Sequence, residues 1–464
     1  MSRSTPARRT ATLLIGAVLA SSATAAAGTA SAGSVTPPAA AVRAVVAYDG
    51  APVQVAGIQL VRHLPALGMA VVQGSPGALA RLGRADGVRG LAPDDALQLA
   101  GGTSGGTGVP AAQGLGGRAG KAGAGAGVRV AVLDTGVSDT AALDRRSGRL
   151  LDAFDADGGT APYSDGYGHG TFMSSILAGG PVDGSAGKPV GVAPGATVLV
   201  VRVARPDGTT SLSQVLAGLD WVAANAGAVD VANLSFSHRR PSGAYGADPL
   251  TAAVEQVRDR GVSVVVSAGN DPSLVGDPGF TPKALTVGAA RLTGEPEVAA
   301  FSGSATVAGV RKPDLVANGV SVLGVLPPDS LAAASSAPVR GSLWRGSGTS
   351  QAAAVTSGVV ALLLQRQPDA TPAEVKALLR RSARPLDGDR DGAGLLRVSH
   401  GRAEGADEPA VGAGGGPGGD PTGEGAFDAS SWSASSWSAS SWSASSWSAS
   451  SWSASSWSAW RAAP

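Results

Sequence analysis

The chain contains five short, largely apolar runs that are rich in valine. They occupy residues 128–133, 197–203, 229–236, 262–266 and 284–288. In each run the apolar side chains stand at odd and even positions alike, so both faces of a strand would be apolar. Strands of this kind are typical of a parallel sheet that helices cover on each side. The pattern therefore predicts a central, mostly parallel sheet.

Longer stretches between and after these runs have the composition of helices. They cover residues 212–226, 249–260, 350–367 and 371–382. The stretch that begins at residue 350 is too short and too rich in small residues to span a bilayer, so we expect a buried helix there. A closing strand is expected near residues 395–398. Strands that alternate with helices predict an α/β fold of three layers.

Four polar motifs lie at the ends of the predicted elements, and together they hold the groups of a serine-nucleophile hydrolase. Asp134 ends the first run within Asp-Thr-Gly, and His169 lies in Gly-His-Gly-Thr. Ser350, in Gly-Thr-Ser, opens a predicted helix, and Asn270 follows the run at 262–266. A serine hydroxyl needs a neutral imidazole to accept its proton, and the imidazole needs a carboxylate to orient it.

Each motif alone also has an ordinary structural interpretation. Asp134 could form a turn, His169 a loop, and Ser350 a helix N-cap. Aspartic proteases use Asp-Thr-Gly as well, but they need two such loops, and the sequence has one. The four motifs in this order favour a single shared site, because ligands of open α/β sheets bind beyond the carboxyl ends of the strands.

In their order and spacing these motifs resemble those of the subtilisin-like serine proteases (subtilases), over about residues 128–403. The resemblance implies a subtilisin-like α/β fold and a peptidase that acts through an acyl-enzyme. It assigns Asp134, His169 and Ser350 as the catalytic triad. It assigns Asn270, with the backbone N–H of Ser350, as the donor pair of the oxyanion hole.

The same resemblance predicts a substrate cleft along an edge strand that would pair with the substrate backbone. The primary pocket would be lined by residues from three segments: Ser235, Phe236 and Ser237 on one wall, Gly269 on the other, and Gly276 near the floor. A glycine floor favours a medium or large apolar side chain in the substrate. A second pocket would be lined by Leu212, Val215 and Phe236, which could instead be ordinary core residues.

The resemblance does not extend to the calcium site of many subtilases. Ala142 and Leu143 stand where that site usually has an aspartate, and the loop at 180–188 offers Asp183 as its sole carboxylate. Tight calcium binding needs several oxygen ligands with more than one carboxylate. We therefore expect no metal site of that type and no cofactor.

The first residues have the features of a secretory signal. Arginines precede an apolar segment at 11–20, and small residues including Ala30-Ser31-Ala32 follow it, so a signal peptide is expected over residues 1–32. Localisation outside the cell follows from this prediction.

Residues 42–99 predict a small α+β unit that resembles the pro-segments of subtilases, which serve as folding template and inhibitor. The alternative is an accessory domain that stays attached. The Gly/Ala-rich stretch 100–127 is expected to be a spacer, with the peptidase unit over residues 128–403. We expect self-cleavage near residues 99–102.

After a linker at 404–429, the unit Ser-Ser-Trp-Ser-Ala repeats six times within residues 430–464. A spacing of five fits neither a helix face nor a strand face. The composition favours a disordered tail. The alternative is a multivalent adhesive whose tryptophans bind cell-wall glycan through avidity.

Charge and cysteine content exclude several classes of function. The net charge of +1 gives no reason to expect nucleic acid, and the absence of cysteine excludes disulfides and a cysteine nucleophile. We expect a secreted, monomeric serine endopeptidase that acts on proteins or peptides and is inhibited by its own pro-segment. Retention at the cell wall is expected under the alternative in which the tryptophan tail binds glycan. The competing hypothesis is a weak or inactive subtilase scaffold that binds surface glycans through the tryptophan tail.

Overall fold

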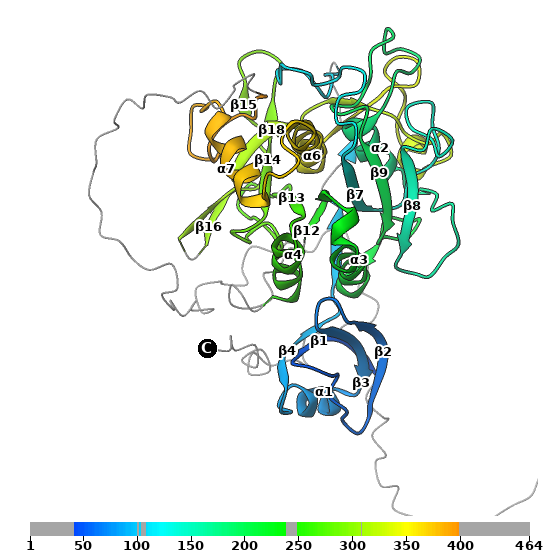
Figure 1. The fold of residues 1–464 in the computed structure, drawn as a ribbon, viewed down its shortest axis with the longest axis vertical. Coiled ribbons are helices and arrows are strands. Elements are labelled where there is room, and N and C mark those ends of the chain that lie inside the picture. The colour runs from blue at the N-terminus through cyan, green and yellow to red at the C-terminus, as the bar shows by residue number, and fades with distance from the viewer. Residues whose placement is uncertain (1–40, 100–101, 104–107, 238–247, 308, 399–464) are drawn as a thin grey trace, which may run out of the picture. The chain divides into compact units, whose positions relative to one another are not determined.

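A computed structural model describes residues 41–99, 102–103, 108–237, 248–307 and 309–398 (Figure 1). The expected signal peptide, the linker at 404–429 and the tryptophan repeats lie outside these residues. Within the described ranges, none of the helices combines the length and the apolar character that a membrane span requires.

The larger part of the structure is built on an eight-stranded sheet with the order β15-β14-β13-β11-β7-β9-β8, in which β18 also pairs with β14. The strands are β7 (Arg129–Asp134), β8 (Leu150–Asp155), β9 (Thr197–Arg202), β11 (Val231–Leu234), β13 (Ser263–Ser267), β14 (Leu285–Arg291), β15 (Glu297–Val298) and β18 (Leu315–Asn318). β15 runs antiparallel to β14, and the other pairs are parallel. The predicted sheet is thereby confirmed.

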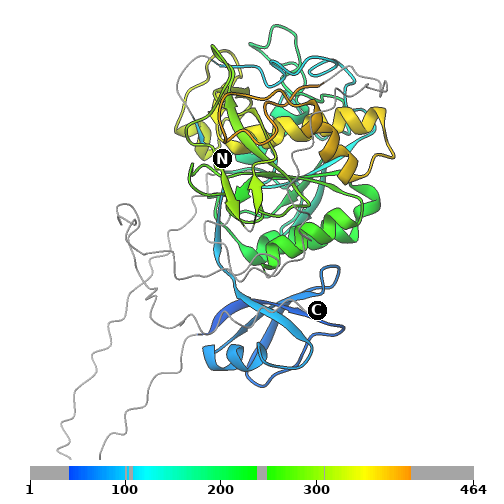
Figure 2. The same ribbon diagram turned by 90° about the vertical axis from the view of Figure 1, so that its left-hand side faces the viewer.

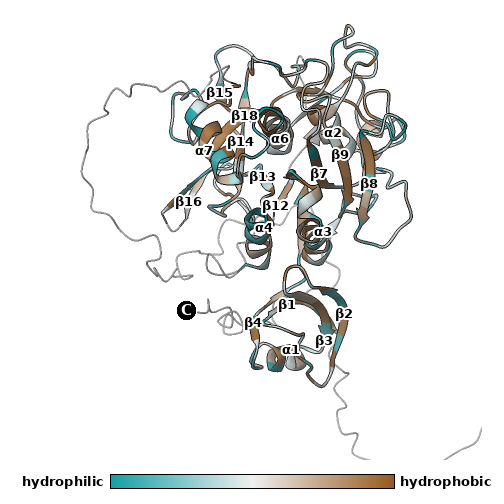
Figure 3. Cartoon of the chain, viewed as in Figure 1, coloured by the Kyte–Doolittle hydropathy of each residue, from teal (hydrophilic) through white to brown (hydrophobic). Residues whose placement is uncertain are grey.

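Helices cover both faces of this sheet (Figures 1 and 2). One layer holds α2 (His169–Ala178), α6 (Thr349–Arg366) and α7 (Pro372–Ser382), and the other holds α3 (Leu212–Ala224) and α4 (Pro249–Asp259). Successive side chains of β7 point to opposite layers: Val130 and Val132 join the cluster of α2 and α6, and Leu133 joins that of α3 and α4. Figure 3 accordingly shows most of β9 as hydrophobic, whereas α4 is partly hydrophilic.

The expectation of a closing strand at 395–398 is wrong. Leu395 forms isolated bridges with Val316 and Arg384, and no longer ladder follows. Gly392 and Gly394 just before it have φ angles of 65° and 117°, so the chain turns sharply as it reaches the sheet. The segment therefore pairs with β18 only through the single bridge between Leu395 and Val316.

The expectation of a spacer is also wrong for residues 109–127, which pack on the sheet's helical layer. Ala111, Leu115 and Ala124 are buried in the same cluster as α2 and α6. The backbone N–H of Gly125 donates to Gln365 Oε1 at 2.9 Å. A Cβ atom on Gly125 would lie 2.8 Å from the Cβ atom of Ala193, so the small residues here permit close packing, not flexibility.

Residues 42–93 form a separate small sheet, which we call the N-terminal unit. It contains β1 (Val42–Tyr48), β2 (Ile58–Leu64), β3 (Met69–Gly74) and β4 (Val88–Pro93) in the antiparallel order β2-β3-β1-β4, with α1 (Pro76–Leu82). One face packs under α1. The other face contributes Val45, Met69 and Val71 to the apolar cluster of α3 and α4.

Two small sheets link the segment after the N-terminal unit to the larger part. β5 (Ala96–Leu99) lies between β10 (Thr210–Ser211) and β12 (Phe236–Ser237), and β6 (Gly102–Thr103) pairs with β20 (Trp344–Ser347), which pairs with β19 (Val322–Gly324). The remaining elements are β16 (Ala305–Val307), β17 (Val310–Lys312), α5 (Leu331–Ala334) and the 3-10 helix η1 (Ala226–Ala228).

A buried ion cluster joins the sheet to α7. Asp314 Oδ2 accepts from Lys312 Nζ and from the N–H of Thr286, both at 2.8 Å, and Oδ1 accepts from Lys376 Nζ at 2.9 Å. Lys312 is 1% exposed, and burial lowers its pKa to about 7. Asp314 is therefore the anion that makes two lysines tolerable in this interior.

We predict that Asp314→Asn lowers the free energy of unfolding by about 3 kcal/mol, because it leaves buried lysines without their anion. This value is at the low end of the range for breaking a buried ion pair, because a buried lysine that has lost its anion can release its proton and become neutral. Urea unfolding followed by circular dichroism measures it. Asp259→Asn is the matched control: Asp259 and Lys283 are 48% and 41% exposed, and their pair is worth under about 1 kcal/mol. Equal losses in the two variants would contradict the assignment.

Candidate active site

The structure places Asp134 and His169 in direct contact. Asp134 ends β7 and is 1% exposed, and His169 opens α2 and is 6% exposed. His169 Nδ1 lies 2.7 Å from Asp134 Oδ1 and 2.9 Å from Oδ2. A buried carboxylate at Nδ1 fixes the tautomer that leaves Nε2 as the proton acceptor. Nε2 is buried and has no hydrogen-bond partner among the described residues.

Glycines on either side of His169 make this approach possible. A Cβ atom on Gly170 would lie 2.2 Å from the carbonyl oxygen of Gly136 in the loop after Asp134. Gly168, the N-cap of α2, has a φ of 104°, which a residue with a side chain adopts only with strain. Both positions therefore require glycine for the loop and the helix to meet.

The charges around His169 stabilise the protonated form of its imidazole. Burial opposes the charged imidazole, but the charge of Asp134, the hydrogen bond to it and the charge of Asp165 together raise the pKa of His169 above its ordinary value. The imidazolium formed during proton transfer is thus stabilised from the Nδ1 side.

Ser350 lies in the first turn of α6 and is fully buried. Its hydroxyl donates to the carbonyl oxygen of Ser235 at 3.1 Å. Leu234 of β11 pairs with Leu133 of β7, so Ser235 and Asp134 follow at the same level on adjacent strands. Ser350 is therefore held at the strand ends that carry Asp134, although its hydroxyl is not bonded to His169.

Asn270 is oriented by the residue before Ser350. Its Oδ1 accepts from the backbone N–H of Thr349 at 2.9 Å and from the Thr349 hydroxyl at 3.0 Å. A backbone N–H can only donate, so the oxygen of this amide must face Thr349. The Nδ2 group of the exposed Asn270 is then the donor available to a ligand beside Ser350.

The predicted cleft residues fall into two groups. Phe236, Leu212 and Val215 are buried in one apolar cluster, and the side chain of Leu97 from β5 is part of the same cluster. Ser235 is fully buried, and Ser237 pairs with Gln98 of β5 through the backbone. Phe236 and Ser237 thus pair with a strand of the chain itself, and pairing with a substrate stays a prediction.

The second group surrounds the predicted primary pocket. Gly269 donates to the Thr349 hydroxyl at 3.1 Å and so lies beside the nucleophile loop. Gly276 is buried, and its neighbour Val275 packs against Ala268, which precedes Gly269. The two predicted pocket segments thus meet, and the role of Gly276 as a floor stays a prediction.

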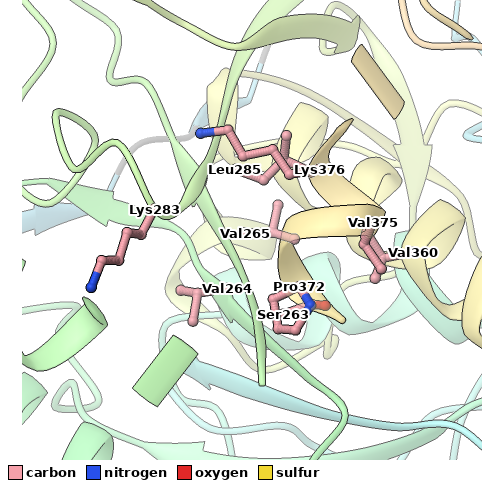
Figure 4. A pocket seen from close by; sticks show the side chains of 9 residues that line it. All are labelled: Ser263, Val264, Val265, Lys283, Leu285, Val360, Pro372, Val375 and Lys376. Atoms are coloured by element: carbon pink, nitrogen blue, oxygen red, sulfur yellow. The ribbon is translucent and has the colours of Figure 1, made fainter. Parts of the chain in front are cut away.

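Two further features of the described residues bear on this site, the distribution of possible metal-ligating side chains and a cavity. In the ranges that the structure covers, no three His, Asp or Glu side chains gather as metal ligands would. The cavity in Figure 4 is lined by residues of α6, α7 and the start of β13, including Ser263, Lys376 and Val360. It adjoins the amino end of β13, whereas Asn270 follows the carboxyl end.

The sequence interpretation missed several residues of the site. Thr135 and Thr349 donate to Asp134 and Asn270, Asp165 accepts from Thr135 and Gly168, and α2 begins at His169 itself. Asp165 could have been suspected, since it stands four residues before His169 in a polar, glycine-rich stretch. No periodic pattern pointed to Thr349, because its contact is with a residue far away in the chain.

Comparison with known proteins agrees with this geometry. Residues 125–414 match the family model described as the Subtilase family. Serine protease AprX of Bacillus subtilis is 34% identical over 55% of this chain and 61% of its own length. Subtilisin BL of Lederbergia lenta is 33% identical over 56% of this chain and 85% of its own length. The chain thus spans less than two thirds of AprX.

A solved structure has the same fold. Fervidolysin from Fervidobacterium pennivorans, described as a keratinolytic enzyme related to subtilisin, superposes with a TM-score of 0.61 at 24% identity. The match covers 78% of this chain and 60% of that one. The chain belongs to the subtilase family, the class of subtilisin-like serine proteases, and the resemblance inferred from its motifs is confirmed.

We predict that Asn270→Ala lowers kcat on a peptide substrate about 10²–10³-fold while KM changes little, because the amide N–H would bind the oxyanion only in the transition state. Steady-state kinetics measure this. Asn225→Ala, at the C-cap of α3, is the control and should keep wild-type kcat. A rise in KM with unchanged kcat would mean that Asn270 binds substrate instead.

Proposed function

We propose that the protein is a secreted serine endopeptidase that cleaves peptide bonds through an acyl-enzyme and removes its own N-terminal unit. The observation that carries the proposal is the 2.7 Å contact between Asp134 and His169 Nδ1, with Nε2 left free, at the strand ends where Ser350 lies. Membership of the subtilase family supports the same activity.

The proposed reaction begins when the Ser350 hydroxyl turns from the Ser235 carbonyl to His169. His169 Nε2 takes the hydroxyl proton while Oγ attacks the substrate carbonyl carbon, and the oxyanion is held by Asn270 Nδ2 and the Ser350 N–H. The imidazolium then gives its proton to the leaving amine as the C–N bond breaks. Water repeats the sequence on the acyl-enzyme, with His169 again as the base, and restores Ser350.

The position of Ser350 assists this chemistry. Its N–H belongs to the first turn of α6, where backbone donors have no partner within the helix. The positive end of the helix dipole favours the negative charge that forms on attack. The preceding residue, Thr349, already fixes Asn270, so both oxyanion donors are held by the same short segment.

The segment after the N-terminal unit supports the proposal of self-processing. On one side of Ser350, β5 pairs with β12, with Leu99 opposite Phe236 and Gln98 opposite Ser237. On the other side, β6 pairs with β20, with Gly102 opposite Ser347. A chain that is bound as a strand on both sides of the nucleophile is bound as a substrate would be.

We infer that the bond cleaved is the one between Ala100 and Gly101. Leu99, the last residue of β5, pairs with Phe236, and the carbonyl oxygen of the preceding residue, Ser235, accepts from the Ser350 hydroxyl. Leu97 would then be the fourth residue before the cleaved bond and is buried with Leu212 and Val215. We expect an apolar residue to be favoured at that position in other substrates.

The activity is tested by replacing the nucleophile. Ser350→Ala should abolish peptide cleavage and labelling by a fluorophosphonate, since the proposed nucleophile is then missing. Ser174→Ala is the matched control, because its buried hydroxyl has no partner and its loss should change neither readout. A Ser350→Ala protein that still hydrolyses casein or takes the label would exclude Ser350. Turnover of esters without cleavage of any peptide would favour an esterase instead.

Self-processing is tested by N-terminal sequencing. The active enzyme should begin at Gly101, and Ser350→Ala should keep the N-terminal unit until active enzyme is added. Leu97→Asp should slow processing, because a carboxylate would enter an apolar cluster, whereas Gln98→Asp should not, because Gln98 is exposed. An active enzyme that retains residues 42–99 would refute self-processing, and equal rates for the two variants would refute the assigned register.

A further inference from the structure

A buried carboxylate that the proposed reaction does not use lies next to the catalytic pair. Asp165 is 2% exposed and lies in the loop before α2. Its Oδ1 accepts from the Thr135 hydroxyl and from the N–H of Gly168, both at 2.7 Å. Its Oδ2 accepts from the N–H and the hydroxyl of Thr171, both at 2.8 Å. Four donors on one buried side chain exceed what a loop turn requires.

These four bonds join the two segments that carry Asp134 and His169. Thr135 follows Asp134, and its hydroxyl also accepts from the N–H of Gly170 at 2.9 Å. Gly168 and Gly170 flank His169. Asp165 thus binds one neighbour of each catalytic residue directly and a second neighbour of His169 through Thr135. A shift of the loop after β7 against α2 would break this chain of bonds.

The charge of Asp165 is not neutralised by a cation in its contacts. All four donors are neutral groups, and each oxygen accepts from one backbone N–H, which favours the ionised carboxylate even though burial raises the pKa of Asp165. The charged groups that act on His169 in the described structure are Asp134, from β7, and Asp165, from the loop before α2. Both are negative.

We infer that Asp165 is a positioning residue of the catalytic pair, which holds Asp134 and His169 in register and supplies a second anion toward the imidazolium. The inference rests on the proposed function, because it concerns the pKa of His169 as the base of the proposed reaction. It goes further than that function, because it assigns part of the basicity of His169 to a residue that touches neither substrate nor the imidazole nitrogens.

The test compares Asp165→Asn with two Thr135 variants on a peptide substrate over a range of pH. Asp165→Asn should lower kcat about 10²-fold, because the catalytic pair loses its clamp. It should also move the acidic limb of kcat to lower pH, because His169 must be neutral to act and loses an anion that raises its pKa. Thr135→Val should lower kcat without moving that limb, since it removes a hydrogen bond but leaves the charge of Asp165 in place. Thr135→Ser keeps the hydroxyl and should have a kcat near that of the wild type.

Asp155→Asn is the control for a purely structural loss. Asp155 is also a buried carboxylate, bonded to Arg202 Nε at 3.0 Å and to the N–H of Gly159 at 2.6 Å, at the end of β8. This variant should lower the melting temperature but leave kcat and its acidic limb at wild-type values.

The outcomes separate the two proposals. Wild-type protein that takes no fluorophosphonate would refute the proposed function itself. With an active wild type, an Asp165→Asn enzyme whose kcat is within threefold of wild type, or whose acidic limb does not move, overturns the role of Asp165. If Asp165→Asn does not fold, the Thr135 pair decides: Thr135→Val as active as Thr135→Ser overturns it, and a loss that only serine restores supports it.

Discussion

The site depends on the common direction of the strands in the sheet. β7, β11 and β13 are adjacent and parallel, so their carboxyl ends bring Asp134, Ser235 and the segment before Asn270 to one edge. Helices α2 and α6 pack on the same face of that sheet and both begin at this edge, with His169 and Ser350 in their first turns. Residues from distant parts of the chain meet because each one terminates or begins an element whose direction the sheet sets.

Within this edge the polar groups are held by one another. Ser357, two turns into α6, donates to Asn233 Oδ1 at 2.8 Å, and Asn233 Nδ2 donates to the Ser235 hydroxyl at 2.9 Å. This chain fixes the strand whose carbonyl receives the Ser350 hydroxyl. Buried polar groups that satisfy each other leave few alternative arrangements, so the geometry is prepared before a substrate binds. Nε2 of His169 is one of the buried atoms left without a partner, and it is the atom that the proposed reaction needs.

The sequence was sufficient for five strands of the mostly parallel sheet, for the helices α3, α4, α6 and α7, and for singling out the paired Asp134 and His169, because these follow from local signals. Apolar runs marked the strands, and short polar motifs marked Asp134 and His169 at or near element ends. The sequence was insufficient where small residues are compatible both with a flexible spacer and with close packing. The glycines and alanines of residues 109–127 suggested a spacer, yet they pack on α6 because their small size permits contact. Gly168 likewise suggested a loop, although it caps α2 with a φ of 104°.

No local pattern could reveal the contacts that residues 42–94 make with the helices α3 and α4. Asp94 accepts from the N–H and the hydroxyl of Ser213 at 2.7 Å each, at the start of α3. Leu67 donates to Asp220 Oδ1 at 3.1 Å, and its carbonyl accepts from Gln256 of α4 at 3.1 Å.

All of these bonds lie on the N-terminal side of the bond proposed to be cut. Cleavage between Ala100 and Gly101 would therefore leave every one of them intact, together with the buried Leu97. It would remove the covalent link that makes the association intramolecular, so that dilution could then favour dissociation. The N-terminal unit would thus pass from a bound substrate to a bound product that blocks the cleft. Its departure would be governed by the interface with α3 and α4, and not by the chemistry at Ser350.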